Sequence, residues 1–186
     1  MFDRDRFIAD CQAARAEDAS HKAVREVVAR SVREPAAVMR ALGEPARSGV
    51  ETLHHSADLT ILNLVWGPHM MIMPHNHLMW AVIGIYSGRE DNIFWRRRVD
   101  DRTARVEAAG AQALGTGETT PLGRDIIHSV TNPIPRFTCA IHVYGGDFFG
   151  AERSEWDAET LIEQPYSIEK TMRLFEEANR APRHGA

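Results

Sequence analysis

The spacing of apolar residues changes twice along the chain. Between residues 7 and 42 they recur three or four positions apart, as in Phe7, Ile8 and Cys11. This spacing places them on one face of a helix. Pro35 directly follows Glu34 and marks the start of a further short helix, because proline fits a first helical turn. The segment 1–45 therefore predicts two or three short helices.

The middle of the chain, residues 46–150, has a different pattern. Short runs rich in β-branched and aromatic residues alternate with Gly, Pro, Asn and Asp; examples are LTILNLVW, WAVIGIY, NIFWRRRV, DIIHSVTN and FTCAIHVY. Many short strands with no helix between them are typical of an antiparallel barrel or sandwich. This segment predicts an all-β core.

The last segment, residues 151–186, is more polar. The run SIEKTMRLFEEANR predicts a closing helix, with Ser167 as its N-cap and with Ile168, Met172 and Phe175 on one face. We expect the N-terminal helices to pack outside the barrel and the last helix to close one side of it. The chain would thus form one domain.

Composition narrows the classes of partner. With 186 residues, 44% of them hydrophobic, and a net charge of −4, the chain is an ordinary globular protein without the basic surface that nucleic acids need. Only Cys11 and Cys139 are present, which is too few for a disulfide framework. The charged N-terminus does not resemble a signal peptide, and no run is long enough to cross a membrane. We expect a cytoplasmic protein that binds small molecules.

Two histidines interrupt an apolar run, MMIMPHNHLMW. If this run is a strand, alternate residues share a face, so Met71, Met73, His75 and His77 would all point into the barrel. A buried histidine pair by itself is more often hydrogen-bonded than bound to metal. A third imidazole changes that balance, and His128 supplies one in a later strand, within PLGRDIIHSVTNP. Together the three histidines predict a metal site.

The order of motifs along the chain resembles that of the thiol dioxygenases, the cupin family that includes cysteine dioxygenase. The motifs are VWGPHMMIMPHNH, a following Gly88, DIIHSVTNP and CAIHVYGGDFF, and the resemblance covers about residues 59–149. It implies a cupin fold, a double-stranded β-helix or jelly-roll barrel. It also implies oxidation of a small thiol to a sulfinic acid with O2.

The resemblance further implies which residues form the active site. His75, His77 and His128 match the iron(II) ligands, and His142 and Tyr144 match a second histidine and an active-site tyrosine. Most cupins add a glutamate shortly after the histidine pair, but LMWAVIGIY has no carboxylate, which favours a three-histidine site. Three neutral imidazoles leave positions open for a thiolate and O2. Zinc, nickel or copper can occupy such a site in purified protein, because these ions bind more tightly than iron.

Several positions depart from the family pattern. Val82 stands where some members carry a cysteine crosslinked to the tyrosine, and Ala140 replaces a serine. The carboxylate-binding arginine of cysteine-type members falls at Gly49, two residues from Arg47. We therefore expect free cysteine to be a poor substrate, and a mercaptocarboxylate, an aromatic thiol or an amino thiol to be a better one.

The predicted substrate contacts are Arg47, Met73 and Met79. Other arginines that could bind a substrate carboxylate are Arg89, Arg96, Arg98 and Arg124. Two other classes of function remain open at this point. One is a metal cupin with another reaction, such as an isomerase, a lyase or a zinc hydrolase. The other is a non-catalytic cupin that binds a small ligand. The expected oligomeric state is a monomer or a homodimer.

Overall fold

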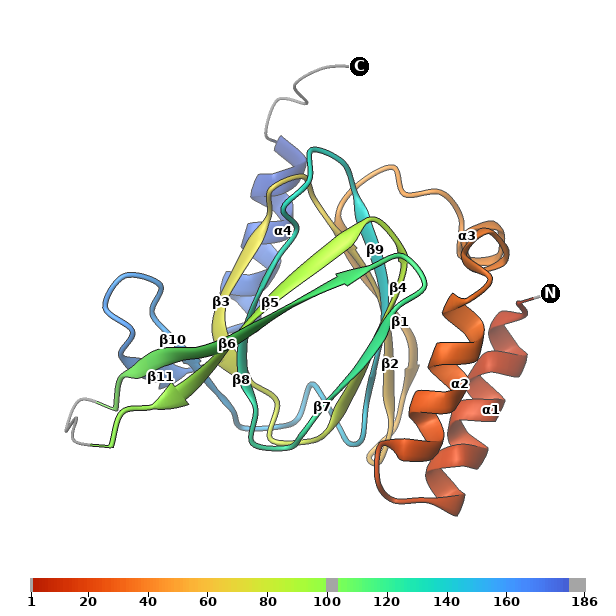
Figure 1. Cartoon of the computed structure of the whole chain (residues 1–186), viewed down its shortest axis with the longest axis horizontal. Helices are drawn as coiled ribbons and strands as arrows, with labels where there is room; N and C mark the ends of the chain where they lie inside the picture. The colour runs from red at the N-terminus through yellow and green to blue at the C-terminus, as the bar shows by residue number, and fades with distance from the viewer. Residues whose placement is uncertain (1, 100–103, 181–186) are drawn as a thin grey trace.

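Two antiparallel sheets face each other and enclose the interior of a barrel (Figure 1). The computed structural model describes residues 2–99 and 104–180. The first sheet consists, in spatial order, of β1 (Gly49–His55), β2 (Thr60–Trp66), β9 (Thr138–Tyr144), β4 (Ala81–Ser87) and β7 (Thr119–Leu122). The second consists of β11 (Glu163–Pro165), β10 (Ser154–Trp156), β3 (Met71–Asn76), β8 (Ile127–Thr131), β5 (Arg89–Arg97) and β6 (Val106–Gly115).

The strand pairing is nested from the outside of the sequence inward. Strand β2 pairs with β9, β3 with β8, β4 with β7, and β5 with β6, all antiparallel. This nesting defines a jelly roll, or double-stranded β-helix. The predicted fold class is confirmed. The barrel also extends further than expected, because β10 and β11 add to the edge of the second sheet beyond residue 150.

Three helices cover the outer face of the first sheet (Figure 1). They are α1 (Arg4–Glu17), α2 (Lys22–Val32) and α3 (Pro35–Leu42). Helix α2 packs against β4 at Gly84, where an added Cβ would lie only 2.5 Å from Val28 and 2.9 Å from Val32. A larger residue at that position would separate the helix from the sheet, so glycine permits the close approach.

The last helix, α4 (Ile168–Arg180), contacts β1 of the first sheet and β3 of the second. Its N-cap is Ser167, whose Oγ accepts a hydrogen bond from the Lys170 amide at 3.1 Å. Phe175 is buried and its ring stacks on Trp66 with 5.4 Å between centroids. Ile168 and Met172 remain 42% and 40% exposed, at the edge of the barrel opening. In the described part of the chain, no helix has both the length and the apolar character that a membrane span requires.

Candidate metal centre

Three buried imidazoles meet inside the barrel. His75 lies in β3 and His77 in the turn that follows it, while His128 lies in β8, opposite His75 in the strand register. The Nε2 atom of His77 is 3.2 Å from that of His75 and 3.3 Å from that of His128. Among the described residues, this is the one group of three or more His, Cys, Asp or Glu side chains whose ligand atoms cluster in this way, and it contains no carboxylate.

The sequence predicts that inward-facing and outward-facing side chains alternate strictly along β3, and this prediction is wrong at one point. Met71 is 61% exposed instead of pointing into the barrel. The register with β8 shifts between Ile72 and His75, which is a β-bulge. Because a bulge inserts an extra residue, it reverses which positions face inward, and Ile72 and His75 both line the interior cavity although they are three positions apart.

The tautomer of His75 and the neutral charge of all three imidazoles suit metal binding. The Nδ1 atom of His75 lies 3.0 Å from the Met73 carbonyl, which can only accept, so this nitrogen carries the proton. Burial, followed by the positive charge of Arg153, lowers the pKa of His75 to about 4. Burial and the neighbouring imidazoles hold the pKa values of His77 and His128 well below the ordinary value. All three rings are therefore neutral near pH 7.

The spacing of the nitrogens fits a metal ion. Ligand nitrogens about 2.0 to 2.1 Å from an ion, at octahedral or tetrahedral angles, are separated from one another by roughly 2.8 to 3.4 Å. The distances of His77 to its two neighbours, 3.2 and 3.3 Å, fall in that range. A single cation is the one partner that all three lone pairs can share at once. The three histidines can hold a metal.

A histidine and a tyrosine of β9 extend the polar part of the cavity. His142 and Tyr144 both line it, as their spacing of two in one strand predicts, and His142 Nδ1 lies 3.1 Å from the Tyr144 hydroxyl. The Tyr144 ring meets that of His77 edge-on, with 5.0 Å between centroids. Burial raises the pKa of Tyr144, so its hydroxyl keeps its proton.

Two residues of β5 that the sequence analysis did not single out support these imidazoles. Glu90 is fully buried, and its carboxylate accepts hydrogen bonds from Trp66 Nε1 at 2.8 Å and Asn92 Nδ2 at 3.0 Å. The same carboxylate lies 3.2 Å from His142 Nε2, and Asn92 Oδ1 lies 2.7 Å from His128 Nδ1. The polar run REDN within GREDNIFW was the available signal, because four consecutive polar residues in a strand place polar side chains on both of its faces, including the buried one.

A buried arginine, also missed, faces the same cavity. Arg153 is 6% exposed and its guanidinium lies between two rings, 3.6 Å from the centroid of Tyr166 and 4.1 Å from that of Phe148. Its Nη1 donates a long hydrogen bond of 3.5 Å to the Asn76 carbonyl. Its buried Nη2 has no hydrogen-bond partner among the described residues. Nothing in the local sequence distinguishes Arg153 from the other arginines.

The cavity that these groups share is small and otherwise apolar. Its volume is about 60 Å³. Since one water molecule needs about 10 to 15 Å³ on this measure, it has room for a ligand of only a few non-hydrogen atoms. The apolar residues that line it are Val50, Leu62, Leu64, Trp66, Ile72, Val130, Phe148, Phe149, Ile168, Met172 and Phe175.

The predicted substrate contacts lie elsewhere. Arg47 lines a separate hollow between β1 and α4, together with Gly49. Met73 is buried but is not among the cavity-lining residues, and Met79 packs against Gly146. The other candidate arginines are all outside the cavity, and two of them form surface ion pairs; these pairs are Arg89 with Asp91 and Arg96 with Glu107.

Comparisons with known proteins find only low similarity. No model of a known protein family matches the chain. A cupin of Methanocaldococcus jannaschii with a double-stranded β-helix fold is 11% identical over 56% of this chain and 85% of its own, with a TM-score of 0.46. A cupin superfamily protein of Desulfitobacterium hafniense is 14% identical over 57% of this chain and 86% of its own, with a TM-score of 0.44.

An enzyme is also among the similar structures. Oxalate decarboxylase of Bacillus subtilis, which has Mn(II) centres, is 16% identical over 51% of this chain and 22% of its own, with a TM-score of 0.40. Matches this weak do not establish a fold. The jelly roll is established by the nested strand pairing of the chain itself.

Proposed function

We propose that this protein is a non-haem iron(II) thiol dioxygenase whose substrate is a small thiol that carries a carboxylate. In the proposed reaction, both oxygen atoms of O2 end on the sulfur, which loses the electrons that O2 gains, and the thiol becomes a sulfinic acid. The observation that carries the proposal is the pairing, in one small cavity, of a three-imidazole group without a carboxylate and a buried arginine with an unused donor.

The ligand set supports iron chemistry of this kind. His75, His77 and His128 are neutral, so they would leave the double positive charge of a bound ferrous ion uncancelled. When bound, that ion supplies a charge that favours the thiolate over the thiol and open positions for the thiolate and O2 side by side. Trp66 and Phe148 contribute aromatic surface to the same cavity.

Arg153 is the reason for proposing a substrate that carries a carboxylate. A guanidinium that is buried with a free N–H group is costly, and a substrate carboxylate is the partner that its planar donors fit best. In this proposal Arg153 replaces Arg47, which lines a different hollow. Because Arg153 would bind the carboxylate, an anionic substrate does not need an arginine at position 49, where this chain has Gly49.

The same cavity disfavours free cysteine. No Asp or Glu is among the residues that line it, so the ammonium group of cysteine would be buried close to Arg153 without a counter-charge. A mercaptocarboxylate without an amino group, such as 3-mercaptopropionate, avoids this cost. Tyr144 packs edge-on against the His77 ring, and its hydroxyl lies 3.1 Å from His142 Nδ1.

A thiol panel tests the proposal. Iron-loaded protein would be supplied with 3-mercaptopropionate, cysteine and cysteamine under air, while O2 consumption and sulfinate formation are followed together. We expect kcat/KM for 3-mercaptopropionate to exceed that for cysteine by about 100-fold or more, which corresponds to the cost of burying an unpaired charge. Sulfinate from none of the thiols would contradict the proposed reaction. Efficient turnover of cysteine would contradict only the exclusion of an ammonium group, and efficient turnover of cysteamine, which has no carboxylate, would contradict the role of Arg153.

A further inference from the structure

The hydrogen bonds around Glu90 have a fixed direction. A carboxylate has no proton to donate, so each of its three partners must turn an N–H group toward it. These partners are Trp66 Nε1 at 2.8 Å, Asn92 Nδ2 at 3.0 Å and His142 Nε2 at 3.2 Å. The indole N–H of Trp66 can only donate. Asn92 could instead have turned its amide oxygen toward residue 90, and His142 a ring nitrogen without a proton.

Two chains of hydrogen bonds, called arms below, start at Glu90, and the first leads to the metal ligands. Because Asn92 turns its amide N–H toward Glu90, its Oδ1 faces His128 Nδ1 at 2.7 Å. An amide oxygen can only accept, so His128 must carry its proton on Nδ1. The remaining lone pair is then on Nε2, the atom that lies 3.3 Å from His77 Nε2. The carboxylate thus selects, through Asn92, the tautomer of His128 that can bind a metal through Nε2.

The other arm leads from Glu90 to Tyr144. A neutral His142 that donates from Nε2 to Glu90 has its lone pair on Nδ1. That nitrogen accepts the proton of the Tyr144 hydroxyl, 3.1 Å away. The hydroxyl proton therefore points toward His142, and the lone pairs of Tyr144 are left toward the cavity that both side chains line.

We propose that Glu90 is a positioning residue that sets the direction of the hydrogen bonds in both arms of the site. It makes Nε2 of His128 a metal ligand and makes the Tyr144 oxygen an acceptor toward the cavity. Glu90 is completely buried near the start of β5 and is not among the residues that line the cavity, so it does not contact a ligand of the cavity directly. The inference rests on the metal site of the proposed function, and the thiol reaction is not needed for it.

The protonated nitrogens can be observed directly. Metal-free, 15N-labelled protein would be studied by long-range 1H–15N correlation, which distinguishes Nδ1–H from Nε2–H histidines. The wild-type spectrum should show His128 as Nδ1–H and His142 as Nε2–H. In Glu90→Gln, the amide oxygen stays on the side of Trp66 and His142, because Trp66 can only donate, and the amide NH2 faces Asn92. Asn92 must then turn its oxygen toward residue 90 and its NH2 toward His128, so His128 should move its proton to Nε2 while His142 stays Nε2–H.

Metal affinity gives a second readout. The Kd for Zn²⁺, measured in competition with a chelator, should rise about 10- to 100-fold in Glu90→Gln, because partners behind a ligand tune affinity to that extent. The matched control is Glu155→Gln in β10. Glu155 is also buried, at 1% exposure, but its carboxylate bonds to Gln164, Ser167 and Lys170. This control should leave both tautomers and the Zn²⁺ affinity unchanged.

A further variant separates the two arms and serves if Glu90→Gln does not fold. Asn92→Ala removes the bonds of Asn92 to Glu90 and to His128 and leaves the bond between Glu90 and His142, so His128 should become a mixture of tautomers while His142 stays Nε2–H. Wild-type protein with a proton on Nδ1 of His142, or Asn92→Ala with His128 unchanged and full Zn²⁺ affinity, would overturn the inference. The expected tautomers in a protein that oxidises no thiol would support Glu90 as the positioning residue and refute the proposed reaction.

Discussion

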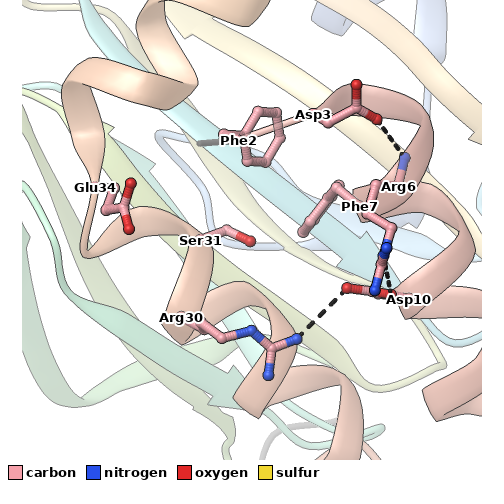
Figure 2. A pocket seen from close by; sticks show the side chains of 8 residues that line it. All are labelled: Phe2, Asp3, Arg6, Phe7, Asp10, Arg30, Ser31 and Glu34. Atoms are coloured by element: carbon pink, nitrogen blue, oxygen red, sulfur yellow. Dashed lines mark hydrogen bonds and ion pairs between the residues drawn. The ribbon is translucent and has the colours of Figure 1, made fainter.

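Two hollows of the molecule contain comparable numbers of polar groups and differ in how those groups are used. The larger, about 210 Å³, lies between α1 and α2 and is open to solvent (Figure 2). There Asp3 caps its helix by accepting from the Arg6 amide at 2.7 Å, and Asp10 lies 3.3 Å from Arg6 and 3.6 Å from Arg30. These exposed charges pair with one another at the surface.

The cavity inside the barrel has the opposite character. It is smaller, yet Arg153 has an unused N–H group there and the Nε2 atoms of His75, His77 and His128 converge on one point. Buried polar groups without partners are expensive, and proteins retain them where a ligand completes them. The comparison teaches that an unmatched buried donor beside converging lone pairs, more than the number of charges, distinguishes the candidate site.

The largest effect should follow from removing a metal ligand. His77→Ala deletes the imidazole whose nitrogen lies closest to both others, so we expect metal binding and turnover to be lost, with affinity lowered at least about 1000-fold. Metal content after dialysis and sulfinate formation measure this. The surface variant His54→Ala is the control and should retain its metal. A His77→Ala protein with a full complement of metal would remove this histidine from the ligand set.

The next effect concerns the buried arginine. Arg153→Met keeps the side chain's bulk and removes the charge, so KM for 3-mercaptopropionate should rise about 100-fold, as the loss of a charge-assisted hydrogen bond implies. Metal content should not change, because Arg153 binds none. Steady-state kinetics give both values. The same substitution at Arg47 tests the arginine that the sequence indicated, and a larger effect there than at Arg153 would reverse the assignment.

A smaller effect, in stability, should appear on acidification of the metal-free protein. Burial and Arg153 place the pKa of His75 at about 4 in the folded state, whereas an unfolded histidine titrates near 6.5. Below about pH 6.5 the unfolded chain therefore binds a proton that folded His75 does not. Stability should fall as the pH decreases from about 6.5 toward 4, by at most roughly 1.4 kcal/mol per pH unit for this residue.

Urea unfolding at a series of pH values measures this loss. His77 and His128 contribute in the same direction, since their pKa values are also lowered. The comparison variant His77→Leu should show a shallower dependence, because one buried imidazole is gone. Equal stability of the metal-free protein at pH 7 and pH 5 would mean that these rings are not buried as neutral groups.

The smallest effect is expected in the hollow between the helices. Asp10→Asn weakens two exposed ion pairs, and such pairs contribute at most about 1 kcal/mol. Thermal unfolding should therefore change little and turnover not at all. A loss of activity in this variant would show that the hollow of Figure 2 has a function that its paired charges do not suggest.

Much of the fold and of the metal centre could be predicted from sequence, because the signals were local. The change of hydrophobic period separated helices from strands, and the spacing of two placed His142 and Tyr144 on one face of β9. The bulge before His75 was not predictable, since it depends on the register with a strand more than fifty residues away. For that reason Met71 was placed inside the barrel.

The supporting residues depend on long-range packing. Arg153 reaches the cavity only because β10 pairs with β3 and the loop before β10 brings the guanidinium between Phe148 and Tyr166. Glu90 acquires its role from partners in β2, β5 and β9. No short motif encodes these contacts, so sequence reasoning could identify the three converging histidines but not the residues behind them or the arginine in the same cavity.

The most direct test of the central claim is the fate of isotopically labelled dioxygen. Iron-loaded protein would oxidise 3-mercaptopropionate under 18O2, and the product would be analysed by mass spectrometry. The account predicts a sulfinic acid that contains both labelled oxygen atoms, formed by the wild type and by no variant that lacks His77. A product whose oxygen comes from water, or consumption of O2 without any sulfinate, would contradict it.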